Sequence, residues 1–184
     1  MTQTPGSSRK RDTPEAVATV LRLRTDTGSR ARLRRAGSPA TERFAYPLLA
    51  GTWTDATRQP ILSFAALAGT FARVEHDETV PLGAMIRKTC STPEDVTRME
   101  RRLTVAQNQT LSGFLTTLRY VFGKATDAGC AVNYVDLYWT VLNWEHPDLD
   151  RRNRVRRRLF ETFFRADNAA AAAAAAAADP TLMP

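Results

Sequence analysis

Apolar residues recur at intervals of three and four along most of the chain, the spacing that gathers side chains on one face of a helix. In the first half this pattern, with its flanking cap and breaker residues, predicts helices over about 13–24, 27–36, 38–44, 60–74 and 82–86. We expect Thr13 to cap the first helix, Asp26 or Thr27 to cap the second, and Pro47 to kink or end the third. The stretch 60–74 is apolar almost throughout, so it is predicted to be the central core helix.

The second half restarts with Ser91–Asp95, a capping-box arrangement that places acids at a helix start. Further apolar stripes predict helices over about 93–106, 111–128, 134–144 and 148–164. Gly129 is expected to close the second of these helices and Asn133 to cap the third. No alternating strand pattern persists, and hairpin dipeptides such as Asn-Gly are absent. The sequence therefore predicts an all-α fold of about eight or nine helices with no β-sheet of note.

The short connections favour two small helical bundles, one over residues 13–90 and one over 91–168, although the two halves could share one core. Residues 1–12 are polar and are expected to form a disordered tail. Residues 169–184 form an Ala-rich tail, in which the run Ala169–Ala178 could continue the last helix with nothing to pack against.

The net charge of the chain indicates which class of partner it binds. The chain has 184 residues, a formal net charge of +7 and a pI near 10.1, which favours nucleic acid over an anionic membrane because basic groups release the counterions condensed on phosphates. No apolar run approaches the ~20 residues that span a bilayer, and no signal-peptide pattern begins the chain. We therefore expect a cytoplasmic protein that does not bind membranes.

Side chains with catalytic potential are few. Histidine occurs only at His76 and His146, without metal-ligand spacing, and Cys90 and Cys130 are too far apart for a CxxC site and are expected to be free thiols. Phosphate-binding glycine loops and nucleophile elbows are absent, and paired carboxylates occur at helix starts, where capping explains them. The sequence therefore predicts no enzyme, no metal and no cofactor.

Two arginine clusters, Arg30–Arg35 and Arg151–Arg158, lie within predicted amphipathic helices. In the first, Leu33 and Ala36 point to the side opposite Arg30, Arg34 and Arg35, so a basic face is predicted. Six of the eight residues in the second cluster are arginines, and these repel one another unless a polyanion neutralises them.

In that last helix, most of the arginines fall on the polar arc, namely Arg151, Arg154, Arg157, Arg158 and Arg165. Arg152 and Arg156 fall on the apolar side. Those two arginines either pair with acids across a contact between subdomains or subunits or reach past the core edge to a phosphate.

Further basic residues lie between the clusters, at Arg98, Arg101 and Arg102 and at Arg119 and Lys124. Each could also belong to a solvated helix face with pairs such as Glu94–Arg98. Three tryptophans, Trp53, Trp139 and Trp144, could stack on bases, but the apolar surroundings of the latter two favour a place in the core or an interface.

Several local motifs follow one another in a particular order along residues 13–165. They are Arg32–Ala36 after Asp26 and Gly28, then Glu100–Leu103, Asn133–Leu137, Leu142–Trp144, and Val155–Leu159 leading to Phe163–Phe164. In their order and spacing the chain resembles the CasB family, the small subunit of the type I-E Cascade CRISPR surveillance complex.

This resemblance implies an all-helical, non-catalytic subunit that lines up head to tail with a second copy of itself, beside the other Cascade subunits that carry the guide RNA. In such complexes base pairing reads the sequence, and modest contacts to the nucleic-acid backbone tip the balance toward an open R-loop. We therefore expect basic side chains to contact phosphates of the displaced strand or of the guide RNA–target DNA duplex, without base readout. The candidates are Arg30, Arg34, Arg35, Arg98, Arg101, Arg102, Arg119, Lys124, Arg151, Arg154 and Arg158.

Two other functions fit a basic helical protein. A helix-turn-helix regulator would place the helix at residues 28–36 in a major groove, but Ser29 is almost the only base-reading residue beside the arginines there. A structural adaptor would use its arginines on acidic protein partners, and its binding would survive nuclease treatment.

Overall fold

Helices dominate the protein in the computed structural model, which describes residues 13–178 and the side chains up to residue 169. The helices are α1 (Glu15–Leu23), α2 (Thr27–Arg35), η1 (a 3₁₀ turn, Glu42–Phe44), α3 (Tyr46–Leu49), α4 (Arg58–Thr70), α5 (Leu82–Lys88), α6 (Pro93–Ala106), α7 (Leu111–Asp127), α8 (Tyr134–Asn143) and α9 (Leu149–Ala178). The strands β1 (Glu75–His76) and β2 (Ala131–Val132) form a short parallel pair. The prediction of an all-α fold is confirmed.

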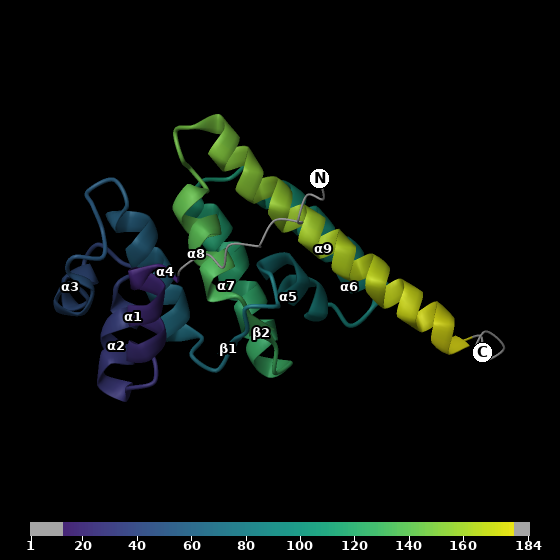
Figure 1. Cartoon of the computed structure of the whole chain (residues 1–184), viewed down its shortest axis with the longest axis horizontal. Helices are drawn as coiled ribbons and strands as arrows, with labels where there is room; N and C mark the ends of the chain where they lie inside the picture. The colour runs from purple at the N-terminus through teal and green to yellow at the C-terminus, as the bar shows by residue number, and fades with distance from the viewer. Residues whose placement is uncertain (1–12, 179–184) are drawn as a thin grey trace, which may run out of the picture.

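Helix α4 lies at the centre of the fold, as its apolar sequence predicts. Every residue from Ile61 to Gly69 is buried, and the helix packs against α2 on one side and α8 on another. Figure 1 shows α1, α2 and α3 at one end of the molecule and α9 as a long helix along the other side, with α7 and α8 between. The two basic helices, α2 and α9, are thus separated by the body of the protein.

Side-chain caps set several helix starts where the sequence predicts them. The Asp26 carboxylate accepts from the Ser29 N–H at 2.7 Å, and the Thr92 hydroxyl accepts from the Asp95 N–H at 3.2 Å. Asn133 accepts from two N–H groups at the start of α8. Gly129 follows α7 with a φ of +61°, the left-handed conformation that glycine adopts at a helix end without strain.

Three local predictions in the first half are wrong. Helix α1 begins at Glu15 behind Pro14, so Thr13 does not cap it. The helix predicted over 38–44 is reduced to η1, and Pro47 stands in the first turn of α3 instead of ending a helix. Proline fits there because the first turn leaves its N–H groups unbonded in any case.

Buried apolar side chains form one cluster that runs from Ala16 in α1 to Phe163 in α9. A continuous core does not decide whether each half folds separately, so the division into bundles at 13–90 and 91–168 stays a prediction. The expected disordered tail at 1–12 lies outside the described residues. In the Ala-rich tail at 169–184 the helix continues to Ala178, and residues 179–184 lie outside the described part of the chain.

Glycines allow two close helix crossings, one under each basic helix. A Cβ on Gly69 of α4 would lie 2.8 Å from the Cβ of Leu33 in α2. A Cβ on Gly83 of α5 would lie 2.6 Å from the backbone N of Phe163 in α9, and closer still to Leu159 O and Thr162 Oγ1. Both α2 and α9 are therefore held by a neighbouring helix that has no side chain at the point of contact.

Candidate nucleic-acid interface

The arginines of α2 form a solvent-facing basic surface. Leu33 is fully buried against α4, which turns Arg34 and Arg35 outward and leaves Arg30 half-buried at the edge. The Arg35 guanidinium lies 5.0 Å from the centre of the Phe44 ring. Within residues 13–169, no ion pair joins an α2 arginine to an acid.

A groove runs beside this surface, between α2, the C-terminal end of α4 and α7. It has a volume of about 480 Å³ and is lined by Arg30, Arg34, Gly69, Thr70, Phe71, Ala72, Arg73, Gly123, Thr126 and Asp127. A second hollow of about 460 Å³, lined by Ala31, Arg34, Arg35 and Thr70, adjoins it. Arg73 is absent from the predicted site residues because the sequence places it in the core helix predicted over 60–74, whereas α4 ends at Thr70 and Arg73 lies exposed in the turn that follows.

Helix α7 brings Arg119 toward the same region. The guanidinium Nη2 of Arg119 lies 3.8 Å from the position that a Cβ of Gly37, just after α2, would take. Arg119, Gly123 and Thr126 are spaced at one and two helical turns, so they form one stripe of α7 that faces α2 and α4. The structure thus brings Arg30 and Arg34 together in the groove and Arg34 and Arg35 in the adjoining hollow, and it places Arg119 beside the residue that follows α2.

Helices α6 and α7 share a second group of basic residues. Asp95 accepts from Arg98 at 2.9 Å, and its other oxygen lies 3.8 Å from the Lys124 ammonium. Arg98 is therefore paired with Asp95 and not with Glu94, the partner that helical spacing suggests. The Arg102 guanidinium lies 4.2 Å from the centre of the Tyr120 ring, and Arg101 is exposed.

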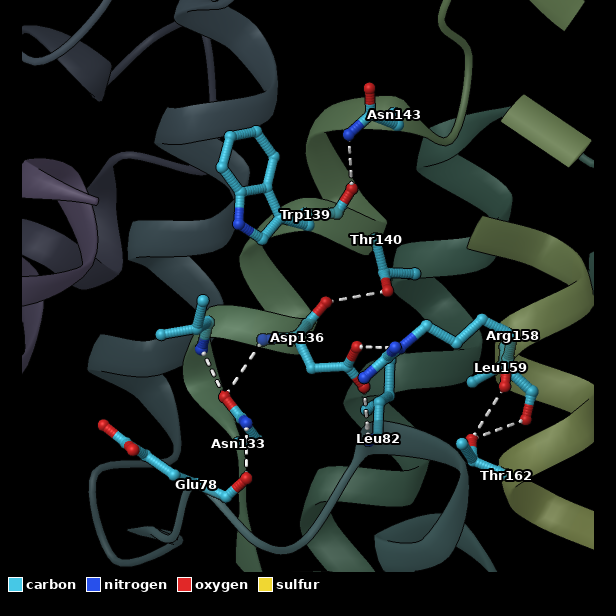
Figure 2. Close-up of polar contacts among 11 residues, drawn as sticks. Glu78, Leu82, Asn133, Asp136, Trp139, Thr140, Asn143, Arg158, Leu159 and Thr162 are labelled. Atoms are coloured by element: carbon cyan, nitrogen blue, oxygen red, sulfur yellow. Dashed lines mark hydrogen bonds and ion pairs between the residues drawn. The ribbon is translucent and has the colours of Figure 1, made fainter. Parts of the chain in front are cut away.

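In α9, two of the three candidate arginines form ion pairs with acidic side chains. Arg151 lies 3.6 Å from the capping residue Asp148, and Arg158 donates to Asp136 of α8 at 2.7 Å. Figure 2 shows Arg158 reaching across from α9 to this carboxylate, whose second oxygen accepts the Leu82 N–H at 2.9 Å. Arg154 is exposed, with no ion pair in the described part of the chain.

Arg152 and Arg156 lie on the inner side of α9, as the helical pattern predicts. Arg156 donates to the Trp144 carbonyl oxygen at 3.0 Å, and its guanidinium lies 5.0 Å from the centre of the indole ring. Burial, and after it the nearby charge of Arg152, lowers the pKa of Arg156 below its usual value. The Nε atoms of both arginines are buried without a hydrogen-bond partner in the described structure. Neither arginine forms an ion pair with a described acid.

The tryptophans have different surroundings. Trp144 is fully buried and stacks on Phe114 with the ring centres 3.5 Å apart, and Trp53 packs edge-on against Tyr46. Trp139 is 38% exposed on α8 (Figure 2), so it is the tryptophan with the most surface available to a ligand.

The histidines accept hydrogen bonds from the backbone, and the cysteines are free thiols. His76 Nδ1 accepts from the Tyr134 N–H at 3.2 Å, and His146 Nδ1 accepts from the Asp148 N–H at 3.0 Å. Cys90 is a buried free thiol whose pKa is raised by burial, and Cys130 is free and half-buried. No group of three or more His, Cys, Asp and Glu side chains suited to a metal occurs within the described residues. None of the helices there has the length and apolar content needed to cross a membrane.

Taken together, the fold and its arginine-lined groove define a helical protein whose candidate interface is a basic surface. The sequence profile of the family described as CRISPR-associated protein Cse2 matches residues 29–164, and the chain belongs to this family, which is the CasB family expected from the sequence. Membership implies a subunit of a CRISPR Cascade complex.

A solved structure supports the same fold. A CRISPR-associated protein of the Cse2 family from Thermus thermophilus is similar over 81% of this chain and 95% of that chain, with a TM-score of 0.61 and 20% sequence identity. No curated protein sequence matches the chain significantly.

Proposed function

We propose that this protein is the non-catalytic small subunit of an RNA-guided DNA surveillance complex in the cytoplasm, where it holds the R-loop open by binding nucleic-acid backbone without reading sequence. A second copy bound head to tail, and the neighbouring Cascade subunits, are the protein partners in this proposal. The observation that carries it is the surface of α2, whose arginines are turned to solvent by the buried Leu33 and are unpaired with acids in the described structure.

Holding these charges together has an energetic cost. Arg30, Arg34 and Arg35 stand within two turns of one helix, and Arg119 of α7 lies near its end. Like charges at this spacing repel, and phosphates relieve the repulsion while releasing their own counterions. A surface of this kind attracts any nucleic-acid strand, which suits a subunit in which base pairing supplies the specificity.

The remaining candidates divide into two groups. Arg101, Arg102 and Arg154 are exposed, and no acid pairs with them among the described side chains, so we assign them to phosphate contact with the α2 group. Arg98, Lys124, Arg151 and Arg158 already have acidic neighbours, so a phosphate must compete with a carboxylate for them. They are proposed as weaker contacts.

The test is the retention of target DNA by a guide-loaded Cascade core that lacks its small subunit, with and without this chain at physiological salt. We expect the chain to slow the release of matched target, and R30A/R34A to lose most of that effect. The matched control is R58A/R165A, which removes the same charge from exposed positions at the far end of α4 and on α9. Release that is unchanged by adding the chain contradicts the proposal.

The same measurements separate the other candidates. A helix-turn-helix regulator would footprint one duplex sequence and leave target release unchanged. An adaptor would join the core whether or not nuclease had removed exposed nucleic acid. The regulator has no specific structural observation in its favour, because α2 presents arginines and hardly any base-reading side chains. The adaptor is distinguished by the nuclease treatment.

A further inference from the structure

We infer that the groove between α2, α4 and α7 takes one unpaired nucleotide of a single strand, so that the protein discriminates displaced strand from duplex. This inference rests on the proposed function and deepens it, because it assigns a particular site and a particular form of nucleic acid. Shape is the first reason: the groove measures about 480 Å³, within the range of small-ligand sites, and a duplex cannot enter a hollow of that size.

The charges of the groove suit a phosphate at one side. Arg30 and Arg34 are one turn apart on α2, and Arg73 joins them from the loop after α4. Arg34 also lines the adjoining hollow with Arg35, so a second phosphate of the same strand has a basic neighbour. Arginine donates two parallel hydrogen bonds to a phosphate, which makes this cluster a site for the backbone on either side of one nucleotide.

Other residues that line the groove suit a base. Asp127 is the one acid among the described residues that line it. Its carboxylate and the Thr126 hydroxyl, which itself donates to Phe122 O at 2.8 Å, supply acceptors for an exposed base edge. Phe71 also lines the groove, and its ring is half-buried against Phe122 at 5.8 Å between centres. A site for phosphate alone has no use for a carboxylate, which repels the ligand, whereas an unpaired base bonds acceptors and packs on aromatic rings.

Gly123 keeps the groove open and provides the sharpest test. It lines the groove from α7, and a Cβ placed on it would meet no atom within 4 Å. A leucine there fills the groove without changing charge and without a clash at the Cβ. An alanine leaves most of the volume free and serves as the matched control.

The experiment measures binding of the full chain to a labelled 12-nucleotide single strand and to a 12-base-pair duplex by fluorescence anisotropy. Base stacking contributes ~1–3 kcal/mol, so we expect G123L to weaken binding of the single strand by about fivefold or more and binding of the duplex by less than twofold. G123A is expected to match the unsubstituted protein on both. R73A is expected to weaken the single strand more than R58A does.

A second measurement does not depend on whether G123L folds. Ultraviolet cross-linking of a bromouracil-substituted single strand to the unsubstituted chain should label the segment 69–73, which contains Phe71. Cross-links elsewhere, or equal losses on single strand and duplex for folded G123L, overturn the inference. If R30A/R34A weakens both ligands while G123L weakens neither, the backbone function stands and the nucleotide site fails. If the unsubstituted chain binds neither ligand, both fail.

Discussion

Helices α2 and α9 have similar arginine-rich sequences, yet the structure uses their arginines differently. In α2 they face solvent and a groove, and none is paired with an acid among the described residues. In α9, Arg151 and Arg158 are paired with acids, and Arg156 covers the buried Trp144. Arginine density along a helix therefore does not measure how much positive charge the helix offers to a ligand.

The difference follows from what each helix packs against. The side of α4 that meets α2 is apolar and small, with Gly69 at the crossing, so it provides no acid for the arginines. Helix α9 crosses α5 and α8, and α8 carries Asp136 in its first turn, where the helix dipole favours a carboxylate. Arg151 instead pairs with Asp148, just before α9 itself. The arginines that stay available are therefore decided by the acids of the partner helix together with those at the start of the basic helix.

The largest effect should come from the glycine under α9. Gly83→Ala places a methyl group against backbone atoms of Leu159 and Phe163, so we expect a loss of about 2 kcal/mol or more in the free energy of unfolding, measured in urea. Gly69→Ala meets the Leu33 side chain at 2.8 Å and should cost less, about 1 kcal/mol. Gly123→Ala is the control and should be neutral or stabilising. Equal stabilities for all three proteins would contradict the close crossing.

The second-largest effect should come from Asp136, whose carboxylate accepts hydrogen bonds from both α5 and α9. Asp136→Ala removes the acceptor of the Leu82 N–H and of Arg158, and α5 has no side-chain cap of its own, so a loss of about 2 kcal/mol is expected. Arg158→Ala leaves the cap in place and should cost below about 1 kcal/mol, as is typical of an exposed partner. Urea unfolding of the two variants tests this order, and a costlier Arg158→Ala would reverse it.

The third prediction compares how much the arginines of α2 and of α9 contribute to the salt dependence of nucleic-acid binding. R30A/R34A should reduce the slope of log affinity against log salt for a single strand by about 1.4, since each phosphate contact contributes ~0.7. R151A/R158A removes the same charge from residues already paired with acids, so less than half of that reduction is expected. Anisotropy titrations at several salt concentrations give both slopes. Equal reductions would mean that pairing in α9 does not limit its use.

The smallest effect should appear at Arg156. Its stem and guanidinium cover Trp144, while its Nε is buried without a partner in the described structure. Arg156→Met keeps an apolar stem and removes the buried charge, so the free energy of unfolding should change by less than about 0.5 kcal/mol. Arg156→Ala uncovers the indole and should cost about 1 kcal/mol. If methionine costs as much as alanine, the charge and not the stem stabilises this corner.

The sequence predicts best those features that depend on near neighbours. Caps at Asp26, Thr92 and Asn133 act within three residues, and the stripe of α4 is apolar enough to identify the core. The prediction for the region around Pro47 is wrong because its short helical turns contain too few apolar residues to show a helical period.

Such patterns do not predict contacts between residues that are far apart in the sequence. Arg158 and Asp136 are 22 residues apart, and β1 pairs with β2 across more than fifty residues. The groove requires α2, α4 and α7 together, so neither Arg73 nor Asp127 could be assigned to it from the spacing of charges. The faces of the basic helices could be predicted, but their partners could not.

The double role of Asp136 limits how the surface charge of this protein can evolve. Losing an acid raises the net charge above +7 in a single substitution. At Asp95 that route is open, because its carboxylate holds Arg98 and Lys124 and accepts no backbone N–H within the described structure. At Asp136 the same step would release Arg158 and uncap α5 together, so a gain in positive charge by loss of an acid costs more stability at α8 than at α6.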